Sequence, residues 1–218
     1  MKQAIGYMMV HAPIVEEEKK FDPNGHEYVD LGLPSGTLWA TMNVGANSET
    51  DVGLYFQWGD TQGYTDTSTK SFSWSDYKWT EDGGSTMLKY NITDDKTILD
   101  LEDDAAYVNW GGSWKMPTVE QCQELLNTDN CTNSWTTVNG VNGRLFTSKT
   151  NENTLFIPTA GGAFDGSMNG VGVYGLVWSS SLFSSNVKIG SYLWFSSNVI
   201  GVNNSYRYYG YPVRGVIG

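Results

Sequence analysis

The 218-residue sequence is poor in cations, with only 13 Lys and Arg residues against 24 Asp and Glu residues. Its net charge of −11 at pH 7 leaves no basic stripe of the kind that binds phosphate backbones, so we expect no nucleic-acid partner. The chain also has no apolar run of about 18 residues, the length that a membrane-spanning helix needs. We therefore expect no membrane insertion.

Histidine is too scarce for most catalytic or zinc-binding sites. His11 and His26 are the only two, and neither has a second ligand at zinc-binding spacing. The chain has no G-x-S-x-G motif, and its carboxylates show no arrangement typical of a glycosidase. We therefore predict that the protein is not an enzyme and has no cofactor and no metal. Asp103 and Asp104 are interpreted as first-turn residues of a helix, where the helix dipole favours carboxylates.

Two cysteines, Cys122 and Cys131, are too few for a disulfide scaffold. A disulfide between them is an open alternative, and free, partly buried thiols are the favoured interpretation. The N-terminal sequence MKQAIGYMMVHAPIV has no uninterrupted apolar core and no small-residue cleavage site. We therefore expect no signal peptide and synthesis in the cytoplasm.

Residues 1–25 are interpreted as an N-terminal extension, because EEEKK is a charged run and FDPNG is a turn signal. Residues 26–218 are interpreted as one domain, which is long enough to bury a core of its own. Whether the extension serves as a docking or oligomerisation arm stays open.

Aromatic residues and glycine are abundant, with 9 Trp, 13 Tyr and 25 Gly. Together with only two helical segments, this predicts an α+β fold with short antiparallel sheets and long irregular loops. The helices are expected around 103–109 and from Val119 to Asn127, the second capped by Thr118 with Gln121 at capping-box spacing. Strands are expected within 27–46, 53–60, 135–149 (a hairpin with an Asn-Gly turn) and 154–161, and loops at 61–96 and 161–175.

The loop at 61–96 is expected to be pinned to the core by Trp74, Tyr77 and Trp79. The glycine-rich segment GVGVYG (170–175) is not preceded by a strand and followed by a helix, as a phosphate-binding loop requires. It is interpreted as a flexible loop.

The stretch from Val177 to Val213 is rich in Ser, Asn, Gly, Tyr and Trp, and its only charges are Lys188 and Arg207. This composition is typical of a binding surface, because rigid rings supply contact area and small polar residues supply adaptable hydrogen bonds. Alternating aromatic and polar residues are also typical of strands that are half buried in a core. In YRYYGYP (206–212), four tyrosines occupy both parities, so a two-faced strand cannot bury them all.

Seven segments together resemble a known family: YVDLGLPSGTLWATMNVGA (28–46), YFQWGD (55–60), DDAAYVNWGGSWKMPTVEQCQELL (103–126), WTTVNGVNGRLFTSK (135–149), LFIPTAGG (155–162), VWSSSL (177–182) and YRYYGYPVRGV (206–216). They are similar to the major paralogous domain of Fibrobacter and Bacteroidetes proteins, which implies a C-type-lectin-like fold. The sequence departs from the family at Met42, where Cys is frequent, and in VRGV, where VRPV is usual. No Cys follows Cys131, so the formylglycine-generating chemistry of a related branch is not expected.

Some such domains resemble the variable proteins of diversity-generating retroelements, in which selected codons near the C-terminus are rewritten. The resemblance implies a ligand-binding domain (26–218) that recognises a protein or glycan on a cell surface, in a phage or bacterial receptor-binding context. Because no signal peptide is expected, a virion location is favoured over the cell surface. The alternative is a fixed carbohydrate-binding or adhesion module of a gut bacterium. The implied ligand-binding positions, expected to point outward on one face, are Tyr174, Leu176, Phe183, Tyr192, Trp194, Val202, Asn204, Ser205, Tyr206, Tyr208 and Tyr211.

Overall fold

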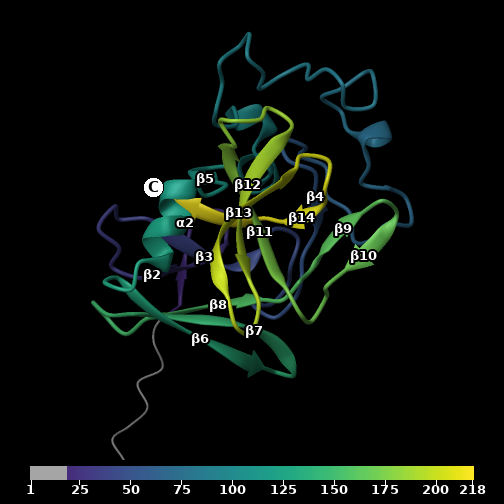
Figure 1. Cartoon of the computed structure of the whole chain (residues 1–218). Helices are drawn as coiled ribbons and strands as arrows, with labels where there is room; N and C mark the ends of the chain where they lie inside the picture. The colour runs from purple at the N-terminus through teal and green to yellow at the C-terminus, as the bar shows by residue number, and fades with distance from the viewer. Residues whose placement is uncertain (1–18) are drawn as a thin grey trace, which may run out of the picture.

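The computed structural model describes residues 19–218, which form a mostly β, mixed α+β fold with two α-helices and several small antiparallel sheets (Figure 1). The α+β class predicted from the sequence is therefore confirmed. The helices are α1 (Ala105–Trp110) and α2 (Val119–Leu126), with short 3-10 helices η1 (Trp74–Asp76) and η2 (Leu101–Asp103). The strands are β1 (Lys20–Phe21), β2 (Glu27–Asp30), β3 (Leu38–Asn43), β4 (Tyr55–Phe56), β5 (Trp114–Lys115), β6 (Cys131–Val138), β7 (Val141–Ser148), β8 (Thr154–Pro158), β9 (Gly162–Phe164), β10 (Ser167–Asn169), β11 (Gly175–Leu182), β12 (Ile189–Phe195), β13 (Ile200–Tyr206), β14 (Tyr211–Pro212) and β15 (Arg214–Ile217).

A five-stranded sheet in the order β1-β2-β3-β15-β5 joins the beginning of the described chain to its end. Trp39 at its centre pairs with Val29 on one side and Val216 on the other, and its side chain is fully buried. The last strand thus closes the sheet that the first strands begin, which holds the C-terminal segment in a fixed place.

Both helices begin at capping residues. Thr118 and Gln121 form the predicted capping box of α2, in which the Gln121 backbone N–H donates to Thr118 Oγ1 (3.3 Å) and the Thr118 N–H to Gln121 Oε1 (2.9 Å). Asp104 is the N-cap of α1, and its Oδ1 accepts from the Tyr107 N–H (3.0 Å). The prediction that Asp103 and Asp104 lie in the first turn of a helix is confirmed for Asp103, which belongs to the single turn of η2, and is wrong for Asp104, which is the N-cap of α1.

Cys122 on α2 and Cys131 on β6 are both buried and free, which confirms the favoured interpretation. Burial in apolar surroundings raises the pKa of the Cys122 thiol to about 12. Neither thiol is therefore ionised at neutral pH, and both act as small apolar side chains between α2 and the β6–β7 hairpin.

The β6–β7 hairpin confirms the Asn-Gly turn. Val138 pairs with Val141, and Asn139 and Gly140 adopt φ angles of 49° and 83°, the left-handed pair that a two-residue hairpin turn requires. The loop expected at 161–175 is wrong in part, because β9 and β10 form a second hairpin around Asp165 and Gly166. The strand expected at 53–60 is limited to β4.

The segment 61–96 is irregular apart from η1 and the isolated bridge from Tyr64 to Tyr55, and it spreads over the top and one side of the molecule (Figure 1). Tyr77 Oη donates to the Trp58 carbonyl (2.8 Å), and Trp79 Nε1 donates to the Gly59 carbonyl (3.0 Å). These bonds confirm that aromatic residues pin the insertion to the core.

Residues 19–25 are attached to the first sheet. Lys20 and Phe21 pair with Tyr28 and Glu27, and Trp114 Nε1 donates to the Asp22 carboxylate (2.9 Å). The boundary expected at residue 25 therefore falls inside the first hairpin. Residues 1–18, which include His11 and the N-terminal stretch in which no signal peptide is expected, lie outside the described residues.

The three-stranded sheet β11-β12-β13 lies between two hydrophobic clusters. Trp178 and Tyr192 belong to the cluster on one face, and Val177, Leu193 and Phe195 belong to the cluster on the other. Every residue of β11 is buried, whereas β13, which pairs only with β12 among the described strands, is half exposed. The sheet thus extends from the core, where β11 lies, to the surface, where β13 lies.

Candidate functional site

The register of β12 and β13 divides the predicted binding residues between the two faces of the sheet. Directly paired residues lie on the same face, and residues alternate along each strand. Tyr192, Trp194 and Ser205 therefore share one face, which follows from the pairs Tyr192–Asn203, Trp194–Gly201 and Gly190–Ser205. Val202 and Asn204 lie on the opposite face.

A chain of ring contacts runs along the first of these faces. Tyr174 lies 6.5 Å from Trp194, Tyr192 4.8 Å from Tyr211, and Tyr211 6.0 Å from Tyr209, measured between ring centroids. Trp194, Tyr192 and Tyr211 all pack in the same hydrophobic cluster, which connects the Tyr174–Trp194 pair to the tyrosines of the row.

At its other end the row continues beyond the sheet. Tyr209 stacks on Phe164 (4.7 Å, 18° between planes) and touches Tyr208 (4.7 Å), which in turn lies against Trp74 (4.7 Å) and Tyr206 (5.6 Å). We call the partly exposed rings of this row the aromatic face, which consists of Trp74, Phe164, Tyr174, Trp194, Tyr206 and Tyr209.

The expectation that all eleven predicted residues point outward is wrong for four of them. Leu176, Tyr192, Tyr208 and Tyr211 are buried, because the rings around them and the covering insertion exclude solvent. Tyr174 and Tyr206 are exposed, with 42% and 44% of their surface accessible. Phe183, Trp194 and Ser205 are half buried.

Three further predicted residues are not part of the aromatic face. Val202 packs on the opposite cluster, and Asn204 accepts a hydrogen bond from Ser191 Oγ (2.8 Å) on that side of the sheet. Phe183 follows the end of β11, opposite to the end that Tyr174 precedes. The structure thus brings together Tyr174, Trp194 and Tyr206 at the surface, above the buried Tyr192, Tyr208 and Tyr211.

Sequence reasoning missed Trp74, Phe164 and Tyr209 as members of the same surface. The sequence pattern predicts a pinning role for Trp74 and a loop around Phe164. Their contacts with the C-terminal rings span about 40 to 130 positions of sequence, and no local pattern encodes such contacts. Tyr209 was the one member that a local signal, the tyrosine run 206–211, did indicate.

The buried side chain of Arg207 holds this tyrosine run in place. Its Nε donates to Tyr77 Oη (2.7 Å), and its terminal nitrogens donate to the carbonyls of Val187 (2.8 Å), Lys89 (3.1 Å) and Tyr90 (3.3 Å). Tyr77, Lys89 and Tyr90 belong to the insertion, and Val187 lies in the β11–β12 turn. Arg207 therefore ties these two separate segments to the base of the aromatic face.

Aromatic rings enclose the Arg207 guanidinium. Its carbon lies 4.7 Å from the Trp58 ring centroid, 5.3 Å from that of Tyr77 and 5.6 Å from that of Tyr90. Carbonyl dipoles and ring faces compensate the buried charge, and no described carboxylate forms an ion pair with it. Tyr206 and Tyr208 flank Arg207 in the sequence. Their positions therefore depend on the hydrogen bonds and ring contacts that hold the Arg207 side chain, which we call the Arg207 cage.

Asp76 supports the loop that carries Trp74. Its carboxylate accepts from the backbone N–H groups of Ser71 (2.7 Å), Phe72 (3.0 Å) and Ser73 (3.0 Å), and from Gln57 Nε2 (2.9 Å). Burial favours the protonated form, but these hydrogen bonds outweigh it and lower the pKa of Asp76 below its usual value.

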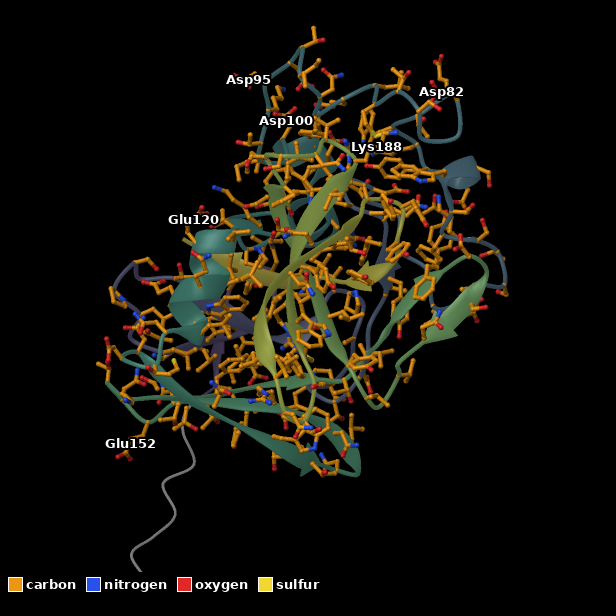
Figure 2. All side chains as sticks on the ribbon, in the orientation of Figure 1. Asp82, Asp95, Asp100, Glu120, Glu152 and Lys188 are labelled. Atoms are coloured by element: carbon orange, nitrogen blue, oxygen red, sulfur yellow. The ribbon has the colours of Figure 1, made fainter. Side chains whose placement is uncertain are left out.

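The Asp76→Asn variant is expected to be less stable than the wild type at neutral pH, with the difference narrowing in acid. The depressed pKa means that Asp76 contributes stability above its unfolded pKa of about 3.9, and that this stability is lost as the pH falls through its folded pKa. Chemical unfolding of both proteins between about pH 7 and pH 3 checks this. Asp95→Asn, at an exposed carboxylate of the same insertion (Figure 2), serves as the control, and a gap that stays constant with pH would contradict the assignment.

Among residues 19–218, one group of acidic side chains has metal-binding proximity: Asp100, Glu102 and Asp103, with oxygens within 4.8 Å of one another. The Lys89 ammonium already occupies its centre, 2.8 Å from Asp100, 2.8 Å from Glu102 and 2.6 Å from Asp103. Partial burial opposes its charge, but the three hydrogen bonds raise the pKa of Lys89 above the usual value. The ammonium supplies the positive charge that a metal ion would otherwise supply.

Comparisons of the chain with protein-family models, with curated proteins and with solved structures found no match. Within residues 19–218, neither helix has the length and apolar character needed to cross a bilayer. Any functional conclusion therefore depends on the geometry of the aromatic face and on the composition of the C-terminal strands.

Proposed function

We propose that the protein is a non-enzymatic recognition protein that binds its ligand, a protein or a glycan on a cell surface, through the aromatic face. The observation that carries this proposal is the row of partly exposed rings from Tyr174 to Trp74, supported from below by buried tyrosines and Arg207. Aromatic residues on a rigid base supply contact area at low entropic cost, which is the property of binding hot spots. Asn203 and Ser205, beside the rings on β13, supply hydrogen-bonding groups at the rim.

We further propose that the fold is C-type-lectin-like. Three features support this assignment: the first and last strands share one sheet, two helices flank it, and a long irregular insertion covers the C-terminal strands. In such an arrangement the C-terminal residues are held on a stable framework. A framework of this kind suits both a diversified and a fixed binding surface.

Diversification by a retroelement is proposed for exposed positions only. Tyr174 and Tyr206 have large accessible surfaces, so exchange of these residues leaves core burial nearly unchanged. Leu176, Tyr192 and Tyr211 are packed in the main cluster, where replacement by a smaller residue costs about 2–5 kcal/mol. The burial of these positions favours the second candidate, a fixed carbohydrate-binding or adhesion module of a gut bacterium, because a fixed site keeps its aromatic residues.

Sequencing the 3′ end of the gene across a cultured population separates the two candidates. Substitutions confined to the codons of exposed positions such as 174 and 206, with a near-identical template nearby, would support diversification. A uniform 3′ end without such a template would contradict it and leave a fixed module.

Binding by the aromatic face is tested with the double variant Trp194→Ala/Tyr206→Ala. Labelled protein is applied to a panel of intact bacterial cells and to a glycan array, and the variant is expected to bind at least about tenfold more weakly, or about 1.4 kcal/mol. Its melting temperature should stay close to that of the wild type, because both rings are partly exposed. Phe21→Ala, at an exposed ring on β1, is the matched control. Equal loss in the control, or undiminished binding by the double variant, would contradict the proposal.

A further inference from the structure

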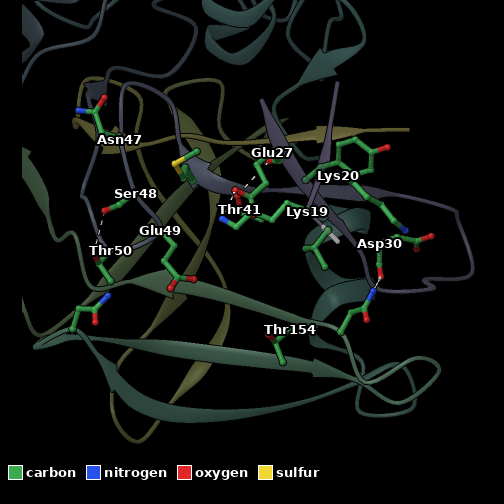
Figure 3. A pocket seen from close by; sticks show the side chains of 15 residues that line it. Lys19, Lys20, Glu27, Asp30, Thr41, Asn47, Ser48, Glu49, Thr50 and Thr154 are labelled. Atoms are coloured by element: carbon green, nitrogen blue, oxygen red, sulfur yellow. Dashed lines mark hydrogen bonds and ion pairs between the residues drawn. The ribbon is translucent and has the colours of Figure 1, made fainter. Parts of the chain in front are cut away.

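A polar groove lies between the five-stranded sheet and the edge of β8, on a part of the molecule that shares no lining residue with the aromatic face (Figure 3). It encloses about 560 Å³. Thr41 on β3, Glu49 in the loop after β3 and Thr154 at the start of β8 line it from three sides. Pockets of a few hundred to about 1,000 Å³ hold small organic ligands in proteins, so the groove has the size of a ligand site.

Several lining side chains keep their hydrogen-bonding capacity free. Among the described residues, the side chains of Glu49, Asn139 and Thr154 make no hydrogen bond. Asn139 is placed by the β6–β7 turn, and Thr154 begins the edge strand β8, so these groups lie at separate points along the groove wall. A carboxylate, an amide and a hydroxyl together can both accept and donate hydrogen bonds to one ligand.

The charges of the lining disfavour an anionic ligand. Three carboxylates, of Glu27, Asp30 and Glu49, line the groove against the ammonium groups of Lys19 and Lys20. Lys19 is already paired with Glu27 at 2.9 Å. A phosphate or sulfate would therefore meet like charge, whereas a neutral ligand with many hydroxyls would find acceptors and donors on both walls.

A second hollow of about 170 Å³ adjoins the groove, since Glu27, Met42 and Asn47 line both of them. His26 and Trp110 wall its far end, stacked with ring centroids 4.4 Å apart. Met42 and these rings give the otherwise polar surface an apolar floor at one end. A sugar ring has the complementary chemistry, with hydroxyls at its rim and C–H groups on its faces.

We propose that this groove and the hollow beside it bind a neutral oligosaccharide. Glu49 accepts hydrogen bonds from sugar hydroxyls, Asn139 and Thr154 accept and donate them, and the Met42–Trp110 end contacts the apolar face of a sugar ring. The elongated lining, from Trp110 near the first sheet to Thr154 on β8, suits several linked sugars rather than one. This site is separate from the aromatic face and does not depend on the function proposed for it.

The test uses the whole protein and four neutral tetrasaccharides: β-1,4-glucan, β-1,4-xylan, β-1,4-mannan and α-1,4-glucan fragments. Amide chemical shifts of the isotope-labelled protein are followed while each sugar is added to millimolar concentration. We expect at least one sugar to shift the signals of groove residues such as Glu49, Thr50 and Thr154, with the aromatic face unaffected. No shift with any of the four, or shifts confined to Trp194 and Tyr206, would overturn the proposal.

Variants then assign the site. Glu49→Ala is expected to weaken binding at least about tenfold, since it removes a charged acceptor at the centre of the groove. Thr154→Trp, which fills the groove from an exposed position, should abolish it. Glu120→Ala, at an exposed carboxylate of α2 (Figure 2), should leave the affinity unchanged. Equal weakening by Glu49→Ala and Glu120→Ala would mean a nonspecific charge effect and would refute the assignment.

Discussion

Replacing Arg207 with methionine is expected to lower the free energy of unfolding by about 3–5 kcal/mol. The methionine fills much of the volume but donates no hydrogen bond, so the carbonyls of Lys89, Tyr90 and Val187 and the hydroxyl of Tyr77 lose a buried partner. Leaving a buried polar group unsatisfied costs about 1–3 kcal/mol. The loss of attraction to the Trp58, Tyr77 and Tyr90 rings adds to this cost.

Urea unfolding followed by tryptophan fluorescence measures the effect. Lys188→Met is the matched control, because it removes a neighbouring cation that is only half buried and lies near the same end of the molecule (Figure 2). Its free energy of unfolding should change by less than about 0.5 kcal/mol. A similarly small change in Arg207→Met would show that the cage does not stabilise the fold.

The variant Arg207→Lys separates charge from geometry. Lysine keeps the positive charge but cannot reach four separate acceptors with a planar fork, so we expect most of the stability to be lost here too. If lysine restored the wild-type stability, the charge alone would be sufficient and the directed hydrogen bonds would not matter. The comparison therefore tests why the tyrosine run contains arginine at its centre.

Features of the fold that depend on a few adjacent residues could be predicted from the sequence. The capping box of Thr118 and Gln121 and the Asn139-Gly140 turn are encoded within four positions of the chain. Each follows from a local conformational preference that needs no tertiary partner. The same argument explains why the α+β class was predictable, since it is the sum of such local preferences.

The burial of the C-terminal tyrosines could not be predicted in this way. Tyr211 is buried because Gly162, about 50 residues earlier, has no side chain: a Cβ there would lie 2.6 Å from the Tyr211 ring. Tyr208 is covered by Trp74, which belongs to an insertion more than 130 residues away. Composition indicated a surface rich in tyrosine, but long-range packing decides which rings reach solvent.

The buried and the exposed aromatic rings have different roles in the candidate site. The buried rings Tyr192, Tyr208 and Tyr211 support the exposed rings from below. The exposed rings Tyr174 and Tyr206 have accessible surface that a ligand could contact. Under the proposed function, we expect a substitution in the first set to change stability and binding together, and one in the second to change binding alone. Measuring both properties for each variant therefore identifies which set a residue belongs to.

Replacing Lys89 with methionine is the other substitution with a large expected effect, about 2 kcal/mol of destabilisation at neutral pH. The variant leaves the carboxylates of Asp100, Glu102 and Asp103 close together without the ammonium that lies between them. Hydrogen bonds from Lys89 are the main cause of the lowered pKa of Asp100 in the wild type. Lys96→Met, which removes a more exposed partner of Asp100 alone, should cost much less.

The pH dependence of this effect follows from the sign of the pKa shift. The wild-type carboxylate has a folded pKa below its unfolded value, so its contribution is present above about pH 4 and is lost as the pH falls further. The stability difference between wild type and Lys89→Met should therefore be largest at neutral pH and shrink in acid, where the Asp100 carboxylate becomes neutral. Thermal unfolding at several pH values checks this.

Thermal unfolding with and without millimolar calcium tests the acidic group itself. Calcium should leave the wild-type melting temperature unchanged, because the Lys89 ammonium lies between the three carboxylates. A rise in melting temperature would show that a metal ion can displace the ammonium.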